Sequence, residues 1–163
     1  MAEKIKFAVI GTGGMAQGHI EKLLTLPEVT LVAFADISDS SIEKTQKRHG
    51  DAVAEIPIFS DYKLMLETVQ PDAVLIATPH TLHFPMAMDC LDAGCHVLLE
   101  KPMVNKVTEA HTLLKKIDET KKSRSIRVSA SLSATLPVYQ RKNSLWRVWG
   151  GAVYQCPSAA GLG

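Results

Sequence analysis

The chain has 163 residues, 46% of them hydrophobic and 21% charged, which is typical of one globular domain with its own core. No apolar run approaches the roughly 18 residues of a membrane-spanning helix, and the early apolar segment runs into glycines instead of a signal-peptide cleavage site, so we expect a cytoplasmic protein with no membrane partner. All 17 acidic residues lie at or before Glu119, but the basic residues beyond it are scattered and lack aromatic neighbours spaced for stacking on bases, so we expect no nucleic-acid partner.

The first half of the chain alternates apolar runs with helical patterns. Residues 5–10 predict a buried strand, which is followed by glycines and then by a helix that Pro27 closes. Residues 29–35 predict a second strand and residues 56–59 a short third one. A helix over residues 60–69 follows.

Two helix starts in this half carry capping signals. Ser40 and Glu43 have the spacing of a capping box, which predicts a helix over residues 41–49 that Gly50 ends. Ser60 is the expected cap of the helix that follows the third strand.

The second half continues the alternation. Residues 73–77 are apolar at every position, which predicts a strand covered on both faces. A helix over residues 82–93 stops at Gly94, and residues 95–99 predict the next strand.

The last predicted helix lies within residues 105–120, and residues 125–131 predict a sixth strand. The helix is expected to turn three apolar side chains inward: Leu113, Leu114 and Ile117. Strands alternating with helices indicate an α/β fold with a doubly wound parallel sheet, the Rossmann fold.

The first strand runs directly into the turn Gly11-Thr12-Gly13-Gly14-Met15-Ala16. In a nucleotide-binding turn Gly11 makes the bend, Gly13 allows the backbone to approach a pyrophosphate, and Ala16 lets helix and strand pack closely. The N–H groups of the first helical turn then face the phosphates. The alternative is a tight turn without a ligand.

Asp36 ends the second strand about 20 residues after the turn, where a carboxylate binds both ribose hydroxyls of adenosine. It favours NAD over NADP, because it repels a 2'-phosphate and the following residues, Ile37 to Asp39, supply no arginine. Asp36 could instead only cap the next helix. Enzymes that use S-adenosylmethionine share these features, so that class stays open on the residues alone.

Two polar segments follow later strands. Ala77 leads into Thr78-Pro79-His80-Thr81-Leu82-His83, and the fifth strand leads into Glu100-Lys101-Pro102. Both are expected at the carboxyl edge of the sheet, where open α/β folds bind ligands. A lysine there can stabilise negative charge during hydride transfer. On residues alone, the lysine could equally be a surface residue, and the histidines a cap and a packing residue.

These motifs together resemble those of the Gfo/Idh/MocA oxidoreductases over residues 4–120. The resemblance depends on the glycine turn with His19, on Ala35-Asp36, on Ala77-Thr78-Pro79 with His83, and above all on Ala93-Gly94-Cys95-His96-Val97-Leu98-Leu99-Glu100-Lys101-Pro102. Cys95 stands where the family commonly has lysine.

The resemblance implies an NAD(P)-binding Rossmann domain and gives roles to its residues. Lys101 would lie beside the nicotinamide ribose and the substrate hydroxyl as the catalytic residue, Glu100 would orient it, and Pro102 would follow a cis peptide bond. Thr78, Pro79 and His83 would line the nicotinamide half. The expected cofactor-binding residues are Gly11, Thr12, Gly13, Gly14, Met15, Ala16, Asp36, Ile37, Ala77, Thr78, Pro79, His83, Glu100, Lys101 and Pro102.

The family also implies a second domain that carries the substrate site, the general acid-base histidine and the face through which members often form homo-oligomers. We therefore expect the NAD(P)-binding domain over residues 1–124 and a truncated or aberrant tail over residues 125–163. No histidine of this chain matches the acid-base histidine, so we expect the chain alone to be inactive.

Residues 141–150 carry both tryptophans and no acidic residue, unlike the charged helix that the family has there. We hypothesise that residues 140–163 are out of frame, which the coding DNA decides. A natural short variant is the alternative, and a nucleic-acid-binding tail is a third.

The expected function is hydride transfer between NAD and a sugar, polyol or related hydroxy compound. A non-catalytic nucleotide-binding module and an inactive, unstable fragment are the alternatives. The cysteines, Cys90, Cys95 and Cys156, form no Cys-x-x-Cys pair and no even framework, so we expect no disulfide and no metal site.

Overall fold

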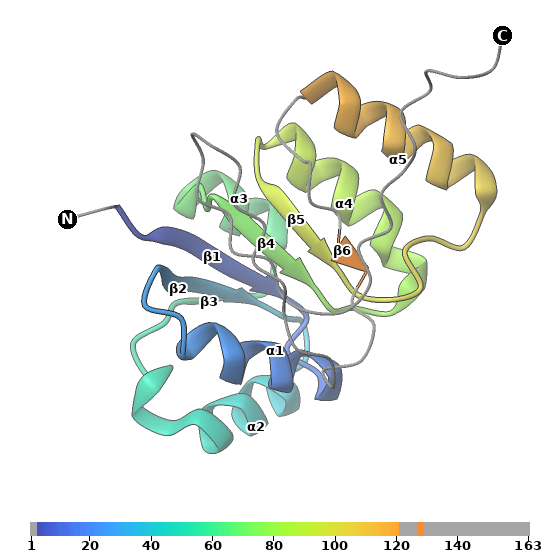
Figure 1. Ribbon diagram of the computed structural model, residues 1–163. Helices are drawn as coiled ribbons and strands as arrows, with labels where there is room; N and C mark the ends of the chain where they lie inside the picture. The colour runs from blue at the N-terminus through green and yellow to red at the C-terminus, as the bar shows by residue number, and fades with distance from the viewer. Residues whose placement is uncertain (1–2, 121–126, 129–163) are drawn as a thin grey trace, which may run out of the picture. The chain divides into compact units, whose positions relative to one another are not determined.

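The computed structural model describes residues 3–120 and 127–128, and of the last two only the backbone. These residues form a six-stranded sheet in the order β3-β2-β1-β4-β5-β6, in which each strand is parallel to its neighbours (Figure 1). This order is that of a doubly wound dinucleotide-binding fold, so the predicted Rossmann fold is confirmed. Met1–Val128 is one compact unit, and residues 129–163 lie outside the described residues.

The strands lie within or close to the predicted segments. They are β1 (Ile5–Ile10), β2 (Val29–Ala35), β3 (Ile58–Phe59), β4 (Ala73–Ile76), β5 (His96–Leu99) and β6 (Arg127–Val128). The first two have the predicted bounds, because an apolar run between charged or turn-forming residues fixes both ends.

Within residues 3–120, five α-helices and two short 3-10 helices connect the strands. They are α1 (Gly14–Leu24), α2 (Asp39–His49), η1 (Gly50–Ala52), α3 (Tyr62–Val69), η2 (His80–Leu82), α4 (His83–Asp92) and α5 (Val107–Thr120). Helices α1 and α2 lie on one side of the sheet, and α3, α4 and α5 lie on the other (Figure 1). None of the helices in the described part of the chain is long and apolar enough to cross a bilayer.

Both predicted N-caps are wrong. The hydroxyl of Ser38, not Ser40, accepts a hydrogen bond from the Ser41 backbone N–H at 3.4 Å, so α2 begins two residues before the expected start. The carboxylate of Asp61, not Ser60, caps α3. In each case several capping residues are adjacent in sequence, and the backbone places one of them in the extended conformation that a cap needs.

The sheet separates two apolar clusters. Successive residues of a strand point to opposite faces, so Val74 and Ile76 face α3, α4 and α5, whereas Leu75 packs with Ile20 of α1. Every residue of β4 is buried, which confirms that this strand is covered on both faces.

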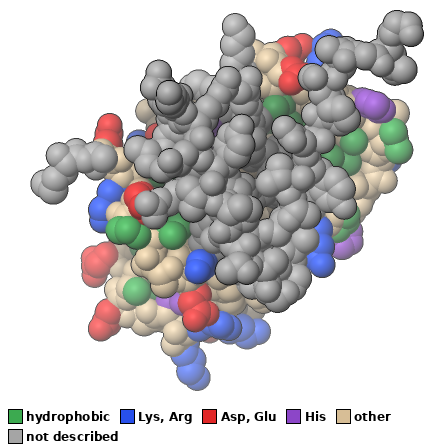
Figure 2. All heavy atoms as spheres, viewed as in Figure 1, with side chains coloured by type: hydrophobic (Ala, Val, Ile, Leu, Met, Phe, Trp, Pro, Cys, Tyr) green, Lys and Arg blue, Asp and Glu red, His purple; other side chains and the backbone are tan. Residues whose placement is uncertain are grey.

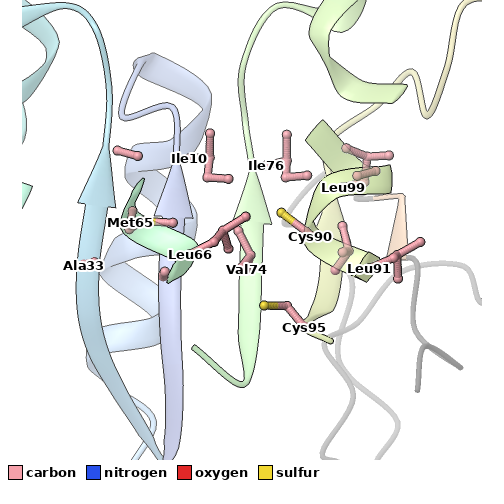
Figure 3. Close-up of a cluster of buried hydrophobic side chains, with 14 of the residues drawn as sticks. Ile10, Ala33, Met65, Leu66, Val74, Ile76, Cys90, Leu91, Cys95 and Leu99 are labelled. Carbon is pink, nitrogen blue, oxygen red and sulfur yellow. The ribbon is translucent and has the colours of Figure 1, made fainter. Parts of the chain in front are cut away.

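Figure 3 shows the larger cluster, in which strand side chains meet those of α3 and α4. It includes Ile10, Val74, Ile76, Leu99, Met65, Leu66, Cys90 and Leu91. Cys90 is a free thiol in this cluster, and burial raises its pKa. Cys156 lies outside the described residues.

Helix α5 covers the edge of this cluster with a narrower face than predicted. Leu113 is fully buried and Ile117 packs against the cluster, but Leu114 remains 38% exposed. One helical residue is a rotation of about 100°, so Leu114 cannot share the inward direction of Leu113.

Figure 2 shows acidic and basic side chains next to one another on the described part of one face. Two exposed ion pairs in the described part of the chain are Arg48 with Glu21, at 3.2 Å, and Lys63 with Asp89, at 3.0 Å. Exposed pairs of this kind contribute only about 0–1 kcal/mol each. The apolar clusters therefore supply most of the stabilisation of the fold.

Candidate dinucleotide site

The glycine turn lies against the end of β4. Gly11 has a φ of +87°, which side chains with a Cβ rarely adopt. A Cβ at this position would lie 2.8 Å from both the carbonyl carbon and the oxygen of Ala77, and 2.9 Å from Cγ2 of Thr78. Only glycine allows β1 to turn this close to the neighbouring strand.

The next two glycines differ from Gly11, because their Cα atoms face open space. A Cβ on Gly13 or Gly14 would meet no atom within 4 Å. Gly13 is the N-cap of α1, and the backbone N–H groups of Gly14 and Met15 have no acceptor within the helix. An anion can therefore approach the positive end of the helix dipole without meeting a side chain.

The last two residues of the turn take opposite positions. Ala16 is fully buried between α1 and the sheet, as its small size predicted. Met15 is 63% exposed.

Asp36 ties the end of β2 to the glycine turn. Its Oδ2 accepts hydrogen bonds from the backbone N–H of Thr12 at 2.7 Å and from the Thr12 hydroxyl at 2.9 Å. Its Oδ1 accepts the backbone N–H of Ser38 at 2.9 Å. Since Ser38 is the cap of α2, the alternative in which Asp36 only caps that helix is wrong. The carboxylate remains partly exposed, and Ile37 beside it is 89% exposed.

A buried hydrogen-bond network that the sequence analysis did not identify holds the glycine turn against α1 and α2. The Nε2 of Gln17 donates to the Thr12 carbonyl at 2.6 Å and to the Thr45 hydroxyl at 2.8 Å, and its Oε1 contacts Nε2 of His49 at 3.0 Å. Burial lowers the pKa of His49 most, and the charge of Arg48 lowers it further, while Glu21 acts in the opposite direction. The lowered pKa favours a neutral ring, which can donate a hydrogen bond to Gln17. The one sign of this network in the sequence is that Gln17, a polar residue, stands next to the apolar residues on the buried face of α1.

The two later motifs meet this turn at the same sheet edge. The Ala77 N–H donates to the Ile10 carbonyl at 2.8 Å, and the Glu100 N–H donates to the Ile76 carbonyl at 3.0 Å. Because β1, β4 and β5 are adjacent and parallel, the segments that follow them are brought together.

Glu100 is buried, and both of its carboxylate oxygens have partners. Oε1 contacts Nε2 of His19 on α1, and Oε2 accepts the Lys101 backbone N–H at 3.0 Å. Glu100 therefore fixes the backbone of Lys101, whose side chain is exposed. The Lys101–Pro102 peptide bond is cis, as the resemblance implied.

His83 is buried at the start of α4, with its ring between two backbone carbonyls. Nδ1 lies 2.8 Å from the Pro102 carbonyl oxygen, and Nε2 lies 2.9 Å from that of Thr78. The ring thus links the segments that follow β4 and β5.

The structure brings most of the predicted site residues to one edge. The glycine turn lies between two groups: Asp36 with Ile37 at the end of β2, and Ala77 to Pro79 with residues 100–102 at the ends of β4 and β5. Among residues 3–120 and 127–128, no group of three or more His, Cys, Asp or Glu could hold a metal ion.

Residues 5–128 match the family model Gfo/Idh/MocA, described as an oxidoreductase family with an NAD-binding Rossmann fold. The chain is similar to the inositol 2-dehydrogenase of Rubrobacter xylanophilus, with 33% identity over 114 residues that cover 69% of this chain and 31% of that protein. It is also similar to an alpha-N-acetylgalactosaminidase of Tannerella forsythia, with 33% identity over 116 residues that cover 68% of this chain and 25% of that protein.

Among solved structures, the chain resembles the WlbA dehydrogenase of Chromobacterium violaceum in complex with NADH and UDP-GlcNAcA. The TM-score is 0.66 with 28% identity, over 75% of this chain and 34% of that one. The chain thus spans about a third or less of the length of these relatives.

Replacing Gly11 by alanine is expected to lower the free energy of unfolding by about 3 kcal/mol, because the new Cβ adds left-handed backbone strain to overlap with the Ala77 carbonyl. Gly14→Ala is the matched control, since its Cβ meets no atom, and it should leave stability unchanged or slightly raised. Urea unfolding measures both variants. Equal stability of the two would contradict the close approach of β1 and β4.

Replacing His19 by alanine is expected to cost about 3 kcal/mol of unfolding free energy, because it leaves the buried Glu100 carboxylate without its partner. Replacing both residues by apolar ones, His19→Leu with Glu100→Met, should cost less than the single change. His111→Ala, at an exposed position on α5, is the control and should stay within about 0.5 kcal/mol of the parent. A loss below 1 kcal/mol in His19→Ala would speak against the pair.

Proposed function

Because this chain belongs to the Gfo/Idh/MocA family of NAD-binding oxidoreductases, we propose that residues 5–128 bind a nicotinamide dinucleotide and present it for hydride transfer beside Lys101. One observation carries the proposal: the open backbone at Gly13 and Gly14 lies at the N-terminus of α1, on the same sheet edge as the lysine segment. A pyrophosphate fits there and would accept hydrogen bonds from the first N–H groups of the helix.

Asp36 would bind the adenosine ribose in this arrangement. An ionised carboxylate has about four acceptor positions, and three donors from Thr12 and Ser38 already contact it. Asp36 is only partly buried and Ile37 beside it is 89% exposed, so a ribose hydroxyl could donate to the remaining acceptor position. The negative charge would repel a 2'-phosphate, so the proposed cofactor is NAD, with NADP bound more weakly.

The nicotinamide half would lie along Ala77, Thr78 and Pro79 towards Lys101. When bound, the nicotinamide ring would supply the carbon that accepts hydride in NAD and releases it in NADH. The ammonium group of Lys101 would donate a hydrogen bond to the substrate oxygen and stabilise negative charge that develops there, which makes Lys101 the proposed catalytic residue. Glu100 supports this role, because it holds the lysine backbone and leaves the side chain exposed.

The proposed substrates are sugars, polyols or related hydroxy compounds. The names of an inositol 2-dehydrogenase and of a dehydrogenase complexed with UDP-GlcNAcA support this class. The similarity to an alpha-N-acetylgalactosaminidase indicates that the dinucleotide domain alone does not fix the net reaction. We also propose a domain over residues 1–124 that is followed by a separate tail. In the full family architecture the protein would assemble into homo-oligomers. Its proposed location is the cytoplasm.

A non-catalytic nucleotide-binding module is the second candidate. It is favoured by the description of the matching family model over residues 5–128, which names NAD binding alone, because hydride transfer needs both reactants in reacting geometry. Turnover of NAD with a panel of polyols and sugars would reject this candidate in favour of an active enzyme.

Calorimetric titration of the full chain with NAD, NADH and S-adenosylmethionine tests the cofactor. We expect binding of both dinucleotides and none of S-adenosylmethionine. Gly13→Ala should weaken NAD binding at least tenfold, because its Cβ occupies the approach of the pyrophosphate, while the melting temperature stays that of the parent. Absence of heat with every ligand would overturn the proposed function.

Replacing Asp36 by asparagine tests the preference for NAD. Loss of the charge should weaken NAD binding about tenfold and bring the affinities for NAD and NADP closer together, because a 2'-phosphate is no longer repelled. Asp39→Asn, on the exposed first turn of α2, is the matched control and should change neither affinity. An unchanged ratio of the two affinities in Asp36→Asn would show that Asp36 does not select the cofactor.

A further inference from the structure

His83 occupies a position that neither capping nor packing explains. It is the first residue of α4 and is only 1% exposed, yet the N-cap of this helix is Leu82 and no side chain caps it. The ring instead lies between the carbonyl oxygens of Thr78 and Pro102, at 2.9 and 2.8 Å.

The two carbonyls belong to the two segments that form the nicotinamide end of the proposed site. Thr78 follows β4 and Pro102 directly follows Lys101, so the residues lie 24 positions apart in sequence. Carbonyl oxygens only accept hydrogen bonds, whereas an imidazole ring donates from one nitrogen when neutral and from both when charged. Among the described residues, the His83 ring is the side chain that contacts both carbonyls.

Lys101 is therefore held on each side by a different buried residue. On its N-terminal side, Glu100 is paired with His19 and accepts the Lys101 N–H. On its C-terminal side, the Pro102 carbonyl faces His83. The backbone is restrained while the lysine side chain stays exposed.

We propose that His83 is a positioning residue, which sets Lys101 against the nicotinamide end of a bound dinucleotide by tying the Pro102 carbonyl to the Thr78 carbonyl. This inference depends on the proposed function. It differs from a purely structural role in one respect: loss of the ring should affect the nicotinamide half of the ligand and spare the adenosine half, which lies at the glycine turn and Asp36.

Binding of NADH and of ADP to the full chain separates the two roles, because ADP contains the adenosine and phosphates but no nicotinamide. His83→Gln is expected to weaken NADH binding about tenfold and to leave ADP binding within twofold of the parent. The two donors of a glutamine amide share one nitrogen, whereas the Pro102 and Thr78 carbonyls face two different nitrogens on separate edges of the His83 ring, so the amide cannot span both carbonyls. His80→Gln is the matched control, since His80 lies three residues away, is exposed, and has its ring centroid 6.3 Å from that of His83.

The double variant tests whether His83 acts through the lysine. If it does, His83→Gln combined with Lys101→Ala should bind NADH no more weakly than Lys101→Ala alone, because residues that act as a unit are not additive. Fully additive losses, equal losses for ADP and NADH, or unchanged NADH affinity in His83→Gln would each overturn the positioning role.

If the parent chain binds ADP and NADH but His83→Gln behaves as the parent, only this inference fails. If the parent binds neither ligand, the proposed function fails with it.

A measurement on the parent chain keeps the inference testable should His83→Gln not fold. NMR of the histidine ring N–H groups should show a slowly exchanging proton on His83 whose signal shifts when NADH is added, but not when ADP is added. The exposed ring of His80 should exchange rapidly under both conditions. A His83 signal that does not respond to NADH would overturn the inference.

Discussion

The close contact between the first turn and the end of β4 is the constraint on which the site depends. Gly11 bends back at a φ of +87° with its Cα against the Ala77 carbonyl, and no other amino acid fits. The contact joins the turn that follows β1 to the segment that follows β4, so the two segments proposed to bind the phosphates and the nicotinamide share one base. The adjacent Ala77 N–H bond to the Ile10 carbonyl continues the sheet up to this point.

Beyond this contact, the loops of the site are held by buried polar contacts and not by apolar packing. Asp36 fixes the turn to β2, Gln17 fixes it to α2, and Glu100 and His83 fix the lysine segment to α1 and α4. Removing one partner of such a buried pair leaves the other unsatisfied, which costs about 1–3 kcal/mol or more for a charged group. The edge is therefore ordered by groups that face inward, and Met15, Ile37 and Lys101 remain exposed.

The sequence predicted the parts of this arrangement that depend on local patterns. The bounds of β1 and β2 and the burial of β4 follow from apolar runs, and the glycine turn and Glu100-Lys101-Pro102 follow from motifs at strand ends. The predicted cap of α2 was wrong because Ser38, Asp39 and Ser40 are all good capping residues, and backbone geometry alone decides among them. The contacts of Gln17 and His83 could not be predicted, because their partners include backbone carbonyls and residues distant in sequence, which leave no pattern in composition or spacing.

The buried contacts also form a continuous physical path between the two ends of the site. Helix α1 starts at the phosphate-binding turn, and five residues later His19 contacts Glu100, which in turn holds the Lys101 backbone. A pyrophosphate bound at this turn, as proposed, would contact the same helix that anchors the lysine segment. Such a path carries coupling only if its elements move as units. Ala16, Ile20 and Leu23 anchor this helix in the core on the same stretch that carries His19, so the turn, the helix and the Glu100 contact share one packed element.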